Sequence, residues 1–186
     1  MNVFQSTLSA NQSTGGNGGW PGGDGNNGLG GGLSISGGYV EVEHSTLSTN
    51  QSIDGAPDYP GRAGQGRGGG LACNNFTLRT RNTILAGNTA ETTARDLSGD
   101  LGSLGHNLIG NSTGGSGFDA TDLLDVNPRL GPLQDNGGPT LTRALLEGSP
   151  AIDAGDNTDA PEFDQRGEGF PRIVNNIIDI GAFEVQ

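Results

Sequence analysis

The sequence contains no lysine, one cysteine and few aromatic residues. All nine of its basic residues are arginines, set against 21 acidic residues, and the formal net charge is −12. Nucleic acid is therefore not an expected partner, because phosphate contacts need clustered positive charge. The single cysteine, Cys73, excludes an internal disulfide, and its apolar neighbours in LAC predict a small core residue.

Long apolar runs are also missing, and none approaches the roughly 18 residues of a membrane-spanning helix. We therefore expect no membrane insertion of this segment. The chain has no basic-then-apolar leader and opens directly in strand-like sequence, MNVFQSTLS (1–9). This opening predicts a fragment whose export signal and first repeat units lie outside the sequence.

Glycine, by contrast, accounts for 36 of the 186 residues, far above the ~7% average. Much of it lies in two runs, GGNGGWPGGDGNNGLGGG (15–32) and GRAGQGRGGG (61–70). Such runs favour loops and turns, because glycine lacks the Cβ that disfavours positive φ. Their spacing is too irregular for collagen, which needs glycine at every third position, so we expect flexible inserted loops.

The phrase STLSANQS (6–13) returns with one letter changed as STLSTNQS (45–52), 39 positions later. Less conserved copies of the phrase follow as TILAGNT (83–89) and SLGHNLIGN (103–111). A phrase repeated in this way indicates a repeated unit of structure, into which glycine-rich loops of variable length are inserted. The segment GYVEVEHSTLS (38–48) alternates apolar and polar residues, as a strand with one buried face does. We predict an all-β solenoid of parallel strands.

In such a stack each residue lies ~4.8 Å above its counterpart one coil away, so equivalent positions form ladders. We expect an inner ladder of Leu8, Leu47 and Leu85. A turn ladder suits asparagine, whose amide bonds up and down the stack and which tolerates left-handed backbone. Its expected members are Asn11, Asn50, Asn88 and Asn111. On the outer face the register pairs Glu41 with Arg79 and Glu43 with Arg81. The alternative for the asparagines is glycosylation, since N-x-S/T begins at Asn11, Asn50, Asn75 and Asn111.

The C-terminal half adds a further series of motifs. They are SLGHNLIGN (103–111), NPRLGPLQDNGGPTLTRALLEGSPAIDAGD (127–156), DQRG (164–167), PR (171–172) and DIGAFE (179–184). This series resembles the C-terminal module of bacterial choice-of-anchor Q proteins, while GGGL and STLSxN resemble repeats of chlamydial polymorphic membrane proteins. The resemblance implies a secreted or cell-surface, right-handed parallel β-helix of the pectin-lyase-like superfamily, with no assigned activity.

From these features we predict two regions. Residues 1–111 would form parallel β-helix coils with long glycine-rich loops. Residues 112–186 would form the last coil or coils and an irregular C-terminal cap containing NGGPT, GSPAIDAG, DQRG and DIGAFE. A coil stack that starts at Met1 exposes an unpaired strand edge, which favours end-to-end self-association.

For function we expect an adhesin-like scaffold that binds a polysaccharide or a cell-surface protein, without catalysis. Trp20 and Tyr59 lie in the inserted loops, where exposed aromatic rings stack on sugars or partner surfaces. The alternative is an extracellular polysaccharide lyase or glycoside hydrolase, which needs carboxylates as acid, base or nucleophile. Candidate catalytic residues are Asp153, Asp164, Arg166 and Asp179, together with Asp156 and Arg172 and, on the outer face, Glu41 and Glu43. Asp–Arg pairs that hold the tail on the last coil are the competing interpretation of the tail residues.

No cofactor is expected, with calcium as the alternative. GGDGNNGLG (22–30), with Asp24, fits a calcium-binding nonapeptide if Asn27 replaces its aspartate, but it has no tandem copy. The segment FDATDLLDVNP (118–128) carries Asp119, Asp122 and Asp125 but lacks the glycine and glutamate of an EF-hand loop. The two histidines, His44 and His106, are expected at the surface or in turns.

Overall fold

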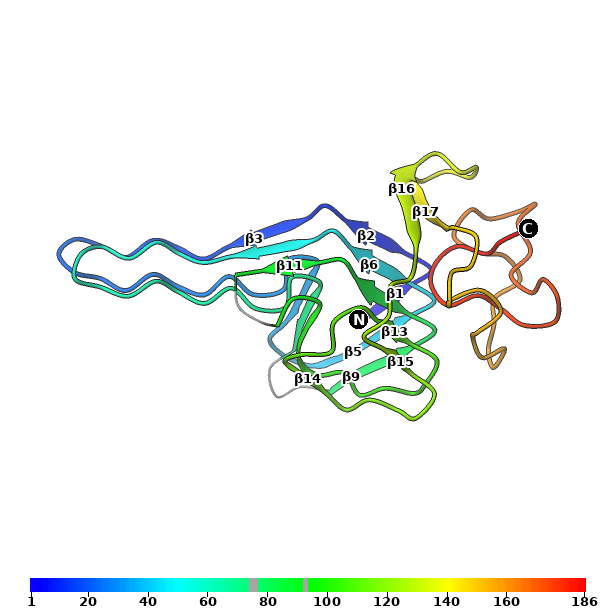
Figure 1. Cartoon of the computed structure of the whole chain (residues 1–186), viewed down its shortest axis with the longest axis horizontal. Coiled ribbons are helices and arrows are strands. Elements are labelled where there is room, and N and C mark those ends of the chain that lie inside the picture. Colours follow the sequence, from blue (N-terminus) through cyan, green and yellow to red (C-terminus); the bar gives the residue numbers. More distant parts are fainter. Residues whose placement is uncertain (74–76, 92–93) are drawn as a thin grey trace.

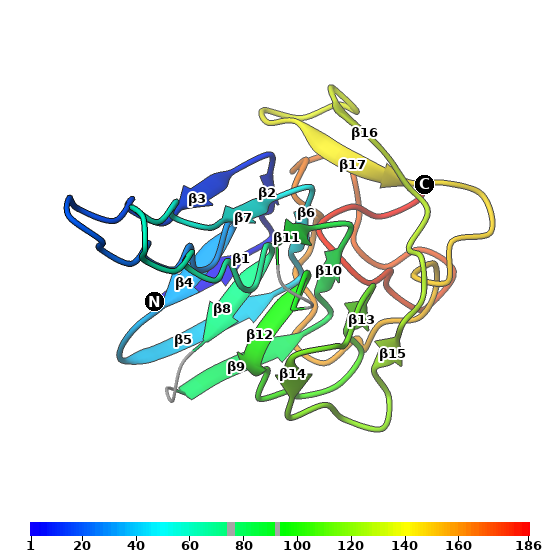
Figure 2. The same ribbon diagram turned by 60° about the vertical axis from the view of Figure 1, so that its left-hand side comes forward.

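The computed structural model describes residues 1–73, 77–91 and 94–186, and every regular element in them is a β-strand. No helix in the described residues is long and apolar enough to cross a membrane. The strands form four parallel sheets and one antiparallel hairpin, none of them closed into a barrel (Figure 1, Figure 2). The prediction of an all-β fold of parallel strands is confirmed.

The chain passes repeatedly through the same sheets, and we call one such pass a coil. The largest sheet consists of β2 (Thr7–Ser9), β6 (Thr46–Ser48), β10 (Ile84–Ala86), β13 (Leu108–Ile109) and β15 (Leu123–Leu124). A second sheet consists of β1 (Asn2–Phe4), β5 (Tyr39–Glu43) and β9 (Thr77–Arg81). A third consists of β3 (Gln12–Thr14), β7 (Gln51–Ile53) and β11 (Thr89–Ala90). The fourth consists of β4 (Leu33–Ile35), β8 (Leu71–Cys73), β12 (Leu97–Asp100) and β14 (Gly115–Ser116).

The register of the first three coils is the one that the repeats predict. Leu8, Leu47 and Leu85 stand opposite one another in the largest sheet. On the second sheet Glu41 pairs with Arg79 and Glu43 with Arg81. The inner ladder belongs to one apolar core, which also includes Cys73 as predicted. Burial of these rungs is the main favourable term that holds the stack together.

Side-chain amides link the coils at the turn after the largest sheet. The N and Nδ2 atoms of Asn11 donate to Asn50 Oδ1 at 3.0 and 2.9 Å. The same atoms of Asn50 donate to Asn88 Oδ1 at 2.9 and 3.0 Å. Asn50 and Asn88 each also donate to the carbonyl of a ladder leucine one coil away, at 2.9 Å. Full burial of Asn50 leaves no room for a glycan on it, and Asn75 lies outside the described residues.

The prediction of Asn111 as the fourth member of this ladder is wrong. Leu85 pairs with Ile109, so the fourth copy of the phrase is offset by one residue from the expected alignment. Asp96 takes the place instead, and its Oδ1 accepts from Asn88 N and Nδ2 at 2.8 Å. Burial raises the pKa of Asp96, while the hydrogen bonds from Asn88 and from the backbone of Asn111 oppose that rise.

The two glycine-rich insertions form a single ordered projection, which we call the finger (residues 15–30 and 54–67; Figure 1). Each insertion runs out and back, and the two insertions stack on each other. Backbone bonds that join them include Gly18 N to Ala56 O at 2.8 Å and Gly25 N to Arg62 O at 2.8 Å. The expectation of flexible loops is therefore wrong, because backbone hydrogen bonds join the two insertions along the finger.

Close packing explains the glycines of the finger. Every third residue along each segment faces its neighbours, and seven of these inward positions are glycine: Gly15, Gly18, Gly25, Gly28, Gly55, Gly61 and Gly64. A Cβ at any of them would lie 1.8 to 2.2 Å from a backbone oxygen, so no side chain fits. Outward glycines such as Gly19, whose Cβ would meet nothing within 4 Å, obscure this spacing in the sequence.

The C-terminal region begins with a hairpin of β16 (Leu130–Gln134) and β17 (Thr142–Leu145). The remaining residues, 146–186, form an irregular segment that we call the tail. It was expected on the last coil but packs along the outer face of the largest sheet, where Ile84 and Leu108 share a second apolar cluster with Ile180. The outward residues of the later strands of that sheet, such as Ile84 and Leu108, are apolar, so they need a cover that solvent cannot give.

We predict that Asn50→Ala lowers the free energy of unfolding by about 3 kcal/mol, because it leaves buried donors and acceptors without partners. Gln51→Ala is the control, since the exposed side chain of Gln51 accepts one hydrogen bond, from Gln12 Nε2, within the described residues; it should cost less than ~0.5 kcal/mol. Urea unfolding of the two variants measures the difference. Equal losses would show that the amide ladder does not hold the coils together.

Candidate functional site

The tail contains a buried ion pair built from the DQRG motif. Arg166 Nη2 lies 2.7 Å from Asp164 Oδ2, and both residues are at most 6% exposed. The guanidinium is held between two rings, with its carbon 4.0 Å from the centre of Phe170 and 3.8 Å from that of Phe183. The same oxygen, Asp164 Oδ2, also accepts from Glu184 N at 2.8 Å. This packing brings the DQRG and DIGAFE motifs together.

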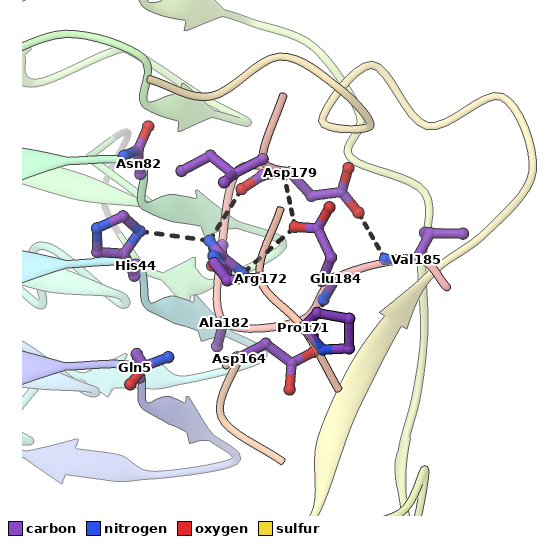
Figure 3. Close-up of polar contacts among 12 residues, drawn as sticks. Gln5, His44, Asn82, Asp164, Pro171, Arg172, Asp179, Ala182, Glu184 and Val185 are labelled. Carbon is purple, nitrogen blue, oxygen red and sulfur yellow. Dashed lines mark hydrogen bonds and ion pairs between the residues drawn. The ribbon is translucent and has the colours of Figure 1, made fainter. Parts of the chain in front are cut away.

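A second arginine, Arg172, lies fully buried between the tail and the coils (Figure 3). Its Nη2 donates to the carbonyls of Asp179 and Gly181 at 2.9 and 2.6 Å. Its Nη1 lies 3.8 Å from Glu184 Oε2, which accepts from Asp179 N at 2.8 Å. Burial lowers the pKa of Arg172, although the neighbouring carboxylates oppose that effect. Burial also raises the pKa of Asp179, and it raises the pKa of Glu184 to about 8.

His44 belongs to this cluster, so the prediction of an ordinary surface or turn residue is wrong in its exposure. His44 is 1% exposed and its Nδ1 lies 3.4 Å from Arg172 Nη2. Burial, followed by the positive charge of Arg172, lowers the pKa of His44 to about 3. His106 is half-buried at a turn, with φ 55°, and its Nδ1 lies 3.0 Å from the carbonyl of Ala154.

His44 occupies a corner that recurs in each of the first three coils. Gln5, His44 and Asn82 have φ values of 44°, 49° and 50° there. The tail covers all three positions, since Gln5 Nε2 donates to Phe163 O and Asn82 exchanges two hydrogen bonds with Asp156, at 2.8 and 2.9 Å. No local sequence pattern indicates this cover, because the covering residues lie more than 70 positions away in the chain.

The predicted catalytic residues occupy structural positions. Asp164, Arg166 and Asp179 come together in the buried cluster, while Asp153 is exposed and joins it only through its backbone N–H, which donates to Asp179 Oδ1 at 2.8 Å. The other Asp179 oxygen accepts from Val185 N at 2.7 Å. The oxygens of Asp164 and Asp179 are taken by backbone and arginine donors of the tail, so these two carboxylates hold the tail in its own conformation.

Two further carboxylates, Glu184 and Glu43, lie in different surroundings. Glu184 was not singled out, although an acid within the apolar run GAFEV is a signal for a buried carboxylate. Glu43, an outer-face candidate, lies 3.2 Å from Arg81 Nη2, which also faces Asp159 at 3.6 Å. Arg81 therefore neutralises Glu43, as the register predicts.

The calcium candidates are engaged in hydrogen bonds within the chain. Asp24 Oδ1 accepts from Arg62 N and Asn27 Oδ1 from Gln65 N, both at 2.7 Å, and these bonds join the two layers of the finger. Asp122 Oδ1 accepts from Asn107 N at 2.9 Å in a second inter-coil ladder. Asp119 accepts from Thr121, and Asp125 from Ser112. Within the described ranges, no three His, Cys, Asp or Glu side chains gather where they could hold a metal ion.

The far end of the finger carries the two most exposed large apolar side chains of the described residues. Trp20 is 87% exposed and Tyr59 is 92% exposed. They stand at equivalent places in the two insertions, each before a cis proline. Asp58 Oδ2 accepts from Gly22 N at 2.9 Å and so ties one tip to the other. The geometry therefore places an indole and a phenol at the end of the same arm.

Comparisons of the chain with protein-family models, with curated proteins and with solved structures gave no match. The resemblance drawn from the motifs therefore stays a hypothesis. The features of the structure that bear on function are the tail cluster, the finger and the surfaces between them.

We predict that the chain is most stable between about pH 4.5 and 6.5. Glu184 has a pKa of about 8 in the fold against an ordinary value of ~4.3, so its contribution is lost progressively as pH rises from ~4.3 through 8. His44 has a pKa near 3 in the fold against ~6.5 when unfolded, so its contribution is lost as pH falls from ~6.5 through 3. The two effects offset each other between about pH 4.5 and 6.5, and stability falls on either side of that window.

Chemical denaturation across this pH range measures the profile. Glu184→Gln keeps an oxygen to accept from Asp179 N but has no proton to lose, so it should flatten the alkaline side. The expected flattening is on the order of 2 kcal/mol between pH 5.5 and 8. An unchanged alkaline slope in this variant would assign the loss to another group.

Proposed function

We propose that this chain is a section of a right-handed parallel β-helix, secreted or displayed on a cell surface, that acts as an adhesin-like scaffold. The stacked parallel sheets and their constant register support the architecture. The order of motifs from GGGL to DIGAFE, which resembles choice-of-anchor Q modules, supports the handedness and the location. The solenoid provides a long, stiff base, and the finger provides the contact surface.

The observation that carries the proposal is the aromatic tip of the finger. Trp20 and Tyr59 contribute nothing to either apolar core, yet the finger is ordered by backbone pairing as far as its tip. Large exposed aromatic side chains are costly to leave in water and characteristic of binding surfaces. An ordered arm also loses less conformational entropy on binding than a flexible loop of the same length.

The ligand class that suits this tip is a saccharide surface. An aromatic ring presents a flat apolar face for the C–H face of a sugar and keeps a polar edge for its hydroxyls. The net charge of −12 argues against a nucleic acid. Cleavage of the saccharide has little support here, because the candidate carboxylates Asp164 and Asp179 are buried and bonded within the tail.

We predict that Trp20→Ala and Tyr59→Ala each weaken binding to an oligosaccharide array at least tenfold, the effect of removing about 1.4 kcal/mol of contact. Thermal unfolding should not change, because both side chains are exposed. Array binding of wild-type chain and variants, followed by calorimetry with the best oligosaccharide, measures the effect.

A matched glycine pair tests the role of the finger itself. Gly64→Ala would place a Cβ 1.9 Å from Asn26 O and should disrupt the finger, so binding should fall with both aromatics intact. Gly19→Ala, whose Cβ meets nothing within 4 Å, should bind like the wild type. Unimpaired binding by the Trp20→Ala/Tyr59→Ala double variant would show that the tip of the finger does not bind the saccharide.

A further inference from the structure

A cavity of about 530 Å³ lies beside the hairpin β16–β17, on the outer face of the largest sheet. It is separate from the finger tip, and the tail cluster does not line it. Its walls come from the turns that follow the strands of the sheet and from residues leading into the hairpin, including Val126, Pro128 and Leu130. The cavity therefore has a sheet for its floor and an apolar side wall.

The floor consists of small residues at one position in three successive coils. Ser48 pairs with Ala86, and the register of the next strands places Gly110 beyond Ala86. A Cβ on Gly110 would lie 2.9 Å from the Cβ of Ala86, so this part of the floor stays flat. A flat, weakly apolar strip suits the C–H face of a pyranose ring better than a bulky side chain.

Two buried polar atoms along this strip have no hydrogen-bond partner within the described residues. They are Ser48 Oγ and Asn111 Oδ1. Ser48 is 1% exposed, and because Leu47 points into the core, strand alternation directs the serine toward the cavity. The Ser48 hydroxyl is a donor that lacks an acceptor, and the Asn111 side-chain oxygen is an acceptor that lacks a donor. A ligand hydroxyl supplies both roles, and buried polar groups without partners call for such an explanation.

The distance between these two atoms and the charges around the cavity restrict the class of ligand further. Ser48 and Asn111 belong to coils two steps apart, which separates them by roughly 10 Å at ~4.8 Å per step, about the length of two hexose rings. Arg95 and Arg143 line the cavity together with Asp96 and Asp125, so the formal charges cancel. Arg143 Nη2 also donates a hydrogen bond to Thr49 Oγ1 at 3.0 Å. Neither a strongly acidic nor a basic ligand is favoured.

We propose that this cavity binds a neutral disaccharide unit. The Ser48 hydroxyl donates to one ring, the Asn111 carbonyl oxygen accepts from the other, and both rings lie on Ala86 and Gly110. The site is independent of the finger, so either could fail without the other.

The test is calorimetry and ligand-observed NMR with cellobiose, maltose and lactose on the full chain. Ser48→Ala should weaken binding of the preferred disaccharide about tenfold, because one hydrogen bond to the ligand is lost. It should leave unfolding unchanged, because Ser48 Oγ bonds no other described residue. Asn111→Ala should act in the same way. The matched control, Ser34→Ala, replaces an exposed serine on β4 and should bind like the wild type.

The outcomes separate this site from the finger. Binding that survives Trp20→Ala but falls in Ser48→Ala supports the cavity. Binding that survives Ser48→Ala and Asn111→Ala, or is lost only in Trp20→Ala, overturns the cavity and assigns the sugar to the tip. Absence of binding by all three disaccharides at millimolar concentration also overturns it.

Discussion

Coil-to-coil hydrogen bonding at a constant register is the constraint on which the rest of this protein depends. Each buried amide of the Asn50 and Asn88 ladder bonds its neighbour and a leucine carbonyl, so a shift of one residue would break several bonds at once. The same register aligns the core leucines and pairs Glu43 with Arg81. It also places Ser48, Ala86 and Gly110 in a row, so the proposed sugar site follows from the stacking.

The outer face of the largest sheet imposes the second constraint. Its apolar residues need a cover, and the tail supplies one although it has no regular strands of its own. A segment without repeating backbone bonds is held by side chains, which accounts for the buried arginines: Arg166 between two rings and Arg172 against His44 and Glu184. Buried charges of this kind tolerate few alternatives, because removing one partner leaves the other uncompensated.

Glycine has opposite roles in different parts of the chain, and sequence alone did not separate them. In the finger, inward glycines such as Gly25 and Gly64 permit close packing of backbones, whereas outward ones such as Gly19 touch nothing. Inward and outward glycines look alike in a glycine-rich run, so the sequence alone predicts a flexible loop. What distinguishes them is which face of the segment meets a second insertion 39 residues away, and local spacing does not record that.

The sequence by itself determined the repeat, and with it the parallel pairing, the inner leucines, the first three members of the asparagine ladder and the Glu–Arg pairs. These features depend on residues at a fixed offset, which a sequence displays directly. Only the tertiary structure decided that Asp96 ends the ladder, that His44 is buried and that the tail lies along the sheet instead of on the last coil. Each of these features depends on contacts between segments that are not related by the repeat. Packing and desolvation determine which residues meet there, and the sequence contains no periodic pattern from which those contacts could be predicted.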